Sequence, residues 1–160
     1  MIDPPRLDAK TEAYLQTYLA SLPQAKDAAR RFYDVMRIGN SDAAADHGAA
    51  LIQQGVKTAT SSLLWTYDAA RRPLPAVGSL SIVIDGRDDP VCVVETTAVD
   101  IQAFAAIDAT FAHAYGEWDR TLETWRAHCW EFKAPRCRAL GKEPTPEMPL
   151  VCERFAVVYP

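Results

Sequence analysis

The chain has 160 residues, of which 49% are hydrophobic and 24% charged, and its formal net charge is −4. These values fit one globular domain with a core of its own. The negative charge argues against a protein that holds nucleic acid by bulk positive charge, although it is compatible with a local basic groove.

Cysteine spacing and the N-terminus indicate the compartment. The four cysteines form no CxxC pair, and no histidine stands at zinc-finger spacing from them. We therefore expect reduced thiols, no metal site and no cofactor. No stretch resembles a signal peptide or reaches the about 20 apolar residues of a membrane span. The expected protein is cytoplasmic and has no membrane partner.

Helical periodicity dominates the first 55 residues. Apolar residues recur at helical spacing over 9–22, which Pro23 ends, and over 25–36, which Gly39 and Asn40 close. A third helix begins after a cap at Ser41 or Asp42 and stops at Gly55. The pattern thus predicts three consecutive helices.

Strands follow in the second half. After a short helix at 63–67, the alternation of Leu80, Ile82 and Ile84 with polar residues predicts a strand that forms a hairpin with 91–99. Residues 103–113 and a segment capped by Thr121 are helical in pattern. Four prolines within 134–149 predict a long loop before a last strand at 150–159. Helices mixed with antiparallel strands give an α+β class.

A cation among hydroxyls marks the stretch from Gly55 to Ser62. Lys57 is followed by Thr58, Thr60 and two serines. A lysine desolvated in a pocket has a lowered pKa and can take the proton of a threonine hydroxyl. In an extended chain Thr58 and Thr60 share one face and Lys57 points the other way, unless the backbone turns. The alternative is that the threonines simply begin a strand.

Two carboxylates on predicted strands are further candidates. An inward-facing Glu95 or Glu153 would be costly to bury unless it is paired or hydrogen-bonded, which makes each a candidate site residue. The alternatives are that Glu95 faces water and that Glu153 pairs with a buried arginine.

A basic stretch runs from Arg126 to Lys142. Arg126, Trp130 and Lys133 fall at helical spacing, and Arg136 and other cations follow. Cations beside tryptophan can follow a phosphate backbone and stack a base, but a solvated helix flank has the same composition.

Together these motifs resemble the ASCH domain family. The family signature resembles Gly55-x-Lys57-Thr58-Ala59-Thr60, and the likeness spans about residues 43–159. It continues through these segments: Val77-Gly78, Pro90, Val94-Glu95-Thr96-Thr97, Phe111-Ala112, Gly116-Glu117-x-Asp119, Leu122-x-x-Trp125-Arg126-x-His128 and Val151-Cys152-Glu153-x-Phe155. The resemblance implies a PUA-like fold, a small β-barrel with surrounding helices, over residues 41–160. Residues 1–40 would be an N-terminal helical extension packed on that domain.

The resemblance also implies a chemistry. Small bacterial members of the family remove acyl groups from the exocyclic amine of cytidine, with a lysine that activates a threonine and a glutamate that carries protons. Lys57 takes the lysine position and Thr60 the threonine position. The expected glutamate falls on Tyr115, so the proton carrier is Glu117, Glu95 or the phenol of Tyr115. The further substrate contacts expected are Thr58, Ser61, Trp65, Tyr115, Trp118, Trp125 and Arg126.

The leading hypothesis is therefore an amidohydrolase whose partner is a small-molecule nucleoside or modified base. The alternative is a single-stranded RNA ribonuclease or an RNA-binding module that uses the basic stretch from Arg126 to Lys142. A third reading is a regulatory module whose N-terminal helices dock a partner through an exposed apolar patch on residues 9–40.

Overall fold

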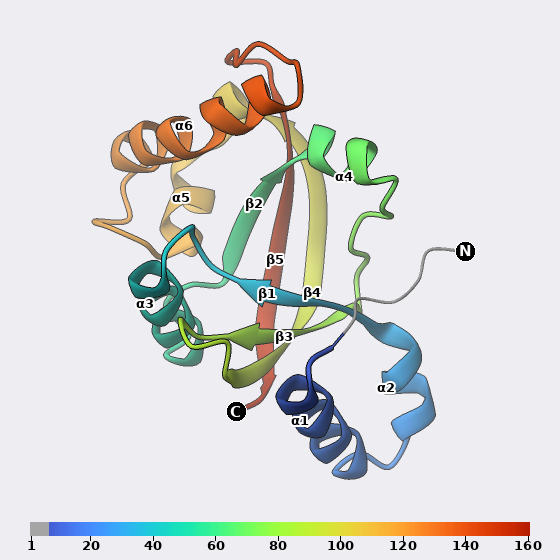
Figure 1. The fold of residues 1–160 in the computed structure, drawn as a ribbon. Helices are drawn as coiled ribbons and strands as arrows, with labels where there is room; N and C mark the ends of the chain where they lie inside the picture. Colours follow the sequence, from blue (N-terminus) through green and yellow to red (C-terminus); the bar gives the residue numbers. More distant parts are fainter. Residues whose placement is uncertain (1–6) are drawn as a thin grey trace.

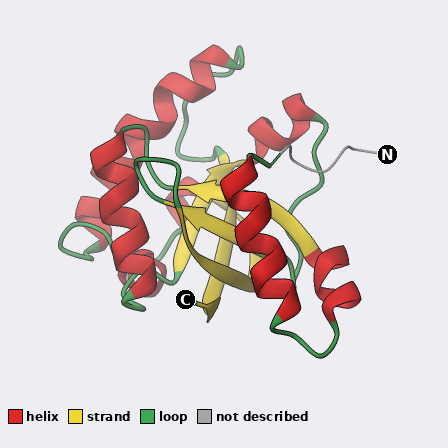
Figure 2. Ribbon diagram, turned by 60° about the horizontal axis from the view of Figure 1, so that its bottom comes forward, coloured by secondary structure: helices red, strands yellow, loops and turns green. Residues whose placement is uncertain are grey.

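The structure is a computed structural model that describes residues 7–160. Helices and strands are mixed along the chain, which confirms the α+β class (Figures 1 and 2). The elements in order are α1 (Ala9–Ala20), α2 (Ala25–Arg31), β1 (Phe32–Arg37), α3 (Asp42–Gln53), β2 (Ala59–Leu63), α4 (Leu64–Ala70), β3 (Leu80–Ile84), β4 (Pro90–Ala103), a 3-10 turn η1 (Phe104–Ala106), α5 (Ala109–Tyr115), α6 (Leu122–Ala139) and β5 (Pro149–Tyr159).

The five strands form one curled sheet in the order β1-β3-β4-β5-β2 (Figure 1). β1 runs parallel to β3, and the other neighbours are antiparallel. The sheet curls into a half-barrel whose two edges are β1 and β2. An edge strand leaves a row of backbone groups unpaired, and these two edges border the cavity described below.

Helices cover the sheet in separate groups (Figure 2). α5 and α6 pack on β2 and β5 around Phe111, Trp125 and Leu150. α1 packs on β3 and β4 through Leu15, Tyr18 and Leu19, and α3 covers Val83 and Val94 with Ile52. Within residues 7–160 the exposed large hydrophobic side chains are Val77, Ile101, Trp118, Val157 and Val158. None of them belongs to residues 9–40, where the docking hypothesis needs an apolar patch.

The structure corrects three predicted segments. The helix expected over 25–36 ends at Arg31, and residues 32–37 are a strand. β4 extends to Ala103, because β5 pairs with it as far as Pro149, so the expected helix at 103–113 is reduced to a turn and α5. α6 continues through Pro135 to Ala139, which shortens the expected loop.

No helix within residues 7–160 is both long enough and apolar enough to pass through a membrane.

Candidate functional site

A cavity of about 660 Å³ is lined by both edge strands of the sheet. α3, α4, α6, the segment after α5, and single residues of β3 and β5 contribute to its lining. The lining includes Thr60, Ser61 and Ser62 of the lysine–threonine stretch. Those used below are Asp34, Thr60, Ser61, Arg72, Tyr115, Glu117, Trp118, His128, Lys133, Arg136 and Glu153.

Lys57 lies in the wall behind this lining and is 1% exposed. Its ammonium donates to Glu117 Oε2 at 2.8 Å and to the Tyr115 carbonyl at 3.1 Å. The same nitrogen lies 3.4 Å from the centroid of the Tyr115 ring, in cation–π geometry. Burial lowers the pKa of Lys57, and the Glu117 carboxylate opposes that shift. Two opposing effects, burial and the neighbouring carboxylate, therefore act on the pKa of Lys57.

Gly116 brings Tyr115 and Glu117 to the lysine. Its φ is +78°, and a Cβ placed on it would lie 2.5 Å from the Val56 carbonyl oxygen and 2.6 Å from Lys57 Cα. Only glycine accepts both the left-handed backbone and the close approach. The turn after α5 consequently lies directly against the Lys57 backbone. A hydrogen bond of 2.8 Å from the Thr58 N–H to the Ala114 carbonyl also joins the two segments.

Thr60 and Ser61 occupy opposite faces of β2. Ala59, Ser61 and Leu63 are buried, whereas Thr60 and Ser62 are half-buried. Both faces meet the cavity because β2 is an edge strand. The Ser61 Oγ atom is buried and has no hydrogen-bond partner within residues 7–160. A buried unpaired hydroxyl costs free energy until a ligand or water satisfies it.

The backbone of Ser61 faces the open edge of the sheet. The Phe155 N–H donates to the Thr58 carbonyl at 3.0 Å, so Thr58 and Thr60 direct their peptide groups toward β5. Ser61 directs its peptide groups the other way, and its carbonyl accepts from Lys133 Nζ at 3.0 Å. The Ser61 N–H is then a donor beside Thr60 on the cavity side, where an oxyanion could be held.

An aromatic stack forms one wall. The Tyr115 and Trp118 rings are stacked at 5.9 Å, and Trp118 stacks on His128 at 4.5 Å. Trp118 has a φ of +55° and is 43% exposed, so this stack meets solvent at Trp118. Burial raises the pKa of the Tyr115 phenol and keeps it protonated.

A second polar group lies across the strand pair from Thr60. Glu153 is opposite Thr60 in the register of β2 and β5, is 7% exposed, and accepts from Thr96 Oγ1 at 2.6 Å. Burial raises its pKa. The arginine that lines this part of the cavity, Arg72, pairs with Asp34 at 2.7 Å.

Some predicted site residues lie outside the cavity lining. Glu95 forms an ion pair with Arg31 at 3.2 Å, and Thr58 donates its hydroxyl to the Ala114 carbonyl at 3.3 Å. Arg126 donates to the carbonyls of Ala105 and Ile107. Of the carboxylates considered, the structure brings Glu117 to Lys57 and leaves Glu95 in its own ion pair.

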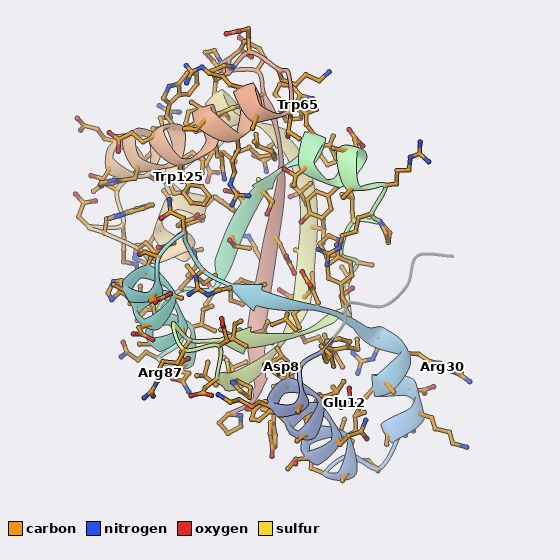
Figure 3. All side chains as sticks on the ribbon, in the orientation of Figure 1. Asp8, Glu12, Arg30, Trp65, Arg87 and Trp125 are labelled. Carbon is orange, nitrogen blue, oxygen red and sulfur yellow. The ribbon has the colours of Figure 1, made fainter. Side chains whose placement is uncertain are left out.

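Two predicted tryptophans also lie outside the lining. Trp125 is 1% exposed and stacks on Phe104 at 5.2 Å in the core under α6. Trp65 belongs to α4 (Figure 3). The ammonium of Lys142 lies 5.7 Å from the centroid of the Trp65 ring. Of the predicted wall residues, Trp118 and Tyr115 are therefore the aromatic side chains at the cavity.

One buried lining residue, Lys133, carries more weight than the sequence reasoning gave it. The sequence predicts Lys133 as part of a basic stretch on the surface, yet it is 2% exposed. A signal was present, because Trp125, Cys129 and Lys133 are spaced by four residues and share the apolar stripe of α6. A lysine inside such a stripe indicates a buried charge.

Within residues 7–160, the His, Cys, Asp and Glu side chains form no group of three or more suited to a metal ion.

Comparison with known proteins agrees with the fold. The ASCH domain matches residues 34–159. The structure of an ASCH domain from Lactobacillus crispatus JV V101 superposes with a TM-score of 0.88 at 28% identity, over 96% of this chain and 97% of that chain. A protein from Enterococcus faecalis V583 superposes with a TM-score of 0.79 at 27% identity, over 94% and 88%. No curated protein sequence matched. The chain belongs to the ASCH domain family.

Proposed function

We propose that this protein is an amidohydrolase that removes the acyl group from the exocyclic amine of an acylated cytidine or a similar nucleoside. Thr60 is the nucleophile, Lys57 its base, and Glu117 the proton carrier. The observation that carries the proposal is the buried Lys57–Glu117 pair, joined at 2.8 Å, behind a cavity that Thr60 and Glu117 both line. A buried lysine of lowered pKa next to a hydroxyl is a recurring way to activate a weak nucleophile.

The first step starts after the shared proton has moved from the Lys57 nitrogen to the Glu117 carboxylate, which leaves an amine and a carboxylic acid. The Lys57 amine accepts the hydroxyl proton of Thr60 while Oγ bonds to the acyl carbon, whose carbonyl electrons move to oxygen. The Ser61 N–H is the donor available for that oxyanion. The C–N bond then breaks, and the leaving exocyclic amine takes the proton of Glu117. Lys57 is now an ammonium and Glu117 a carboxylate.

The second step restores the pair. A water molecule loses a proton to the Glu117 carboxylate as its oxygen attacks the acyl carbon. The ester bond to Thr60 breaks, and Oγ takes a proton from the Lys57 ammonium. The carboxylic acid leaves, and both residues return to their starting protonation states, so one acyl group is transferred to one water.

The aromatic stack supports a planar substrate. A pyrimidine ring can pack against the exposed part of the Trp118 side chain, and the cavity volume of about 660 Å³ is within the range of small-molecule sites.

The test is hydrolysis of cytidine acetylated on its exocyclic amine, followed by chromatography of the released cytidine. Lys57→Met, Thr60→Val and Glu117→Gln should each lower kcat by about 100-fold or more. The matched controls are Lys26→Met and Glu143→Gln, which change exposed residues outside the cavity lining and should keep wild-type activity. Wild-type turnover in folded Lys57→Met or Thr60→Val would refute the mechanism.

A further inference from the structure

Lys133 places a buried amino group at the cavity, and burial lowers its pKa. It is 2% exposed, it lines the cavity from α6, and its Nζ donates to the Ser61 carbonyl at 3.0 Å. An ammonium carries three N–H donors, and this bond uses one of them. The Nζ atom is thus held at Ser61, next to Thr60 in the chain, and its other N–H groups can still donate to a ligand.

Most other cations around the cavity have a carboxylate partner, and two lining carboxylates, Glu131 and Glu153, are in no ion pair within residues 7–160. Lys57 pairs with Glu117 and Arg72 with Asp34, while Arg37 pairs with both Asp42 and Asp88. Within residues 7–160, no carboxylate oxygen lies within 4.0 Å of Lys133 Nζ, since none of the ion pairs there includes it. A buried charge without a counter-ion is costly, and a carbonyl dipole compensates only part of that cost.

A second unpaired cation lies on the same face of α6. Arg136 follows Lys133 by three residues, also lines the cavity, and forms no ion pair within the described part of the chain. Its guanidinium lies 4.9 Å from the centroid of the Phe132 ring, which holds it in place. Residues three apart on a helix are neighbours, so the two cations present donors to one region.

We propose that Lys133 and Arg136 bind a phosphate of the substrate, so that the preferred substrate is an acylated nucleotide and not the free nucleoside. The choice of nucleoside rests on the proposed function, whereas the phosphate site rests on the two unpaired cations. A phosphate supplies several strong acceptors and up to two negative charges, which match a buried ammonium and an adjacent guanidinium.

A purely mechanical role for Lys133 predicts something different. If the residue only fastened α6 to the edge of β2, its loss would disturb Thr60 and would lower activity on every substrate alike. A phosphate site instead makes the loss depend on whether the substrate carries the phosphate.

The experiment compares acetylated cytidine with its 5′-monophosphate on wild type, Lys133→Gln, Arg136→Gln and Arg138→Gln. Arg138 is an exposed cation of the same helix outside the cavity lining, which makes it the matched control. We expect Lys133→Gln to raise KM for the monophosphate by about tenfold or more and KM for the nucleoside by less than about twofold. Arg136→Gln should act in the same direction, and Arg138→Gln should not. Equal effects of Lys133→Gln on both substrates would overturn the proposal.

A binding measurement separates this inference from the hydrolysis. Calorimetric titration with cytidine and with cytidine 5′-monophosphate needs no turnover. Tighter binding of the monophosphate that is lost in Arg136→Gln supports the phosphate site even if no amide is cleaved, and it also covers the case in which Lys133→Gln does not fold. Equal affinities for the two ligands, or no binding of either, would overturn the site while leaving the hydrolysis assay to judge the proposed function.

Discussion

At the scale of single residues, the Lys57–Glu117 pair combines a stability cost with a chemical use. Removing two charges from water is expensive, and their attraction repays this only when both partners are present. Lys57 is wholly enclosed, and the Glu117 side chain is 15% exposed. Loss of one partner therefore differs from loss of both.

We predict that Glu117→Ala lowers the free energy of unfolding at pH 7 by roughly 3 kcal/mol, because it leaves the Lys57 charge buried and unpaired. The double variant Lys57→Met with Glu117→Gln should lose much less, since no charge is left behind. Urea unfolding measures both, and Glu143→Ala on an exposed loop residue should stay within about 0.5 kcal/mol of wild type. Equal losses in the single and double variants would contradict the charge argument.

The same variant should have a characteristic pH dependence. Burial already lowers the folded-state pKa of Lys57 below the 10.5 of the exposed side chain, and Glu117 raises it. Without Glu117 the folded pKa falls further, so the unfolded state binds more protons between that pKa and 10.5. The stability of Glu117→Ala should thus rise relative to wild type as pH increases, by up to about 1.4 kcal/mol per pH unit.

At the scale of elements, the site depends on the turn between α5 and α6. That turn must pass against the backbone before β2, and Gly116 is the residue at the contact. Tyr115 and Glu117, on either side of Gly116, both contact the Lys57 ammonium. A substitution at Gly116 should therefore move these two residues as well as the backbone.

Gly116→Ala should lower the free energy of unfolding by clearly more than Gly141→Ala, which we expect to cost about 1 kcal/mol. Both glycines have positive φ, at +78° and +70°, but a Cβ at Gly141 meets no atom within 4 Å. The difference between the two variants isolates the close contact from the backbone strain. Urea unfolding gives the stability, and near-ultraviolet circular dichroism reports the Tyr115–Trp118 stack. Matching losses would show that the contact relaxes without cost.

Elements also show what sequence could and could not predict. The helix caps at Ser41 and Thr121 and the hairpin of β3 with β4 are local signals, and all were predicted. The strand at 32–37 was not, because its apolar spacing fits a helix, and what decides is the free edge of β3, a distant partner.

In the site, too, local motifs were predicted and contacts between distant segments were not. The family likeness supplied Lys57 and Thr60, but the sequence left Glu117 and Glu95 as alternatives. Their roles depend on Gly116 closing onto Val56 and on Arg31 reaching Glu95, and both are contacts between distant segments. Strand alternation alone set Thr60 and Lys57 on opposite faces, and it could not tell that Lys57 precedes β2 and meets Glu117 behind the cavity lining.

At the scale of the whole molecule, the core under α1 and the cavity lie in different parts of the structure. α1 closes the core at the end of the sheet where the chain terminates, and Tyr18 there packs on Tyr159 at 5.1 Å (Figure 1). No residue of α1 or α2 lines the cavity. Trp118, in the aromatic wall of the cavity, is by contrast 43% exposed.

This separation predicts opposite outcomes for two aromatic truncations. Tyr18→Ala, at 3% exposed, should lower the free energy of unfolding by roughly 3 kcal/mol while kcat/KM of the folded protein stays near wild type. Trp118→Ala should change stability by less than about 1 kcal/mol and should raise KM for the nucleoside, because it removes the surface on which the pyrimidine stacks. Urea unfolding and steady-state assays at a temperature well below both transitions measure the two properties independently. If Tyr18→Ala lost activity in proportion to stability, the cavity would depend on the N-terminal helices, and the extension would be part of the site's support and not only of the core's.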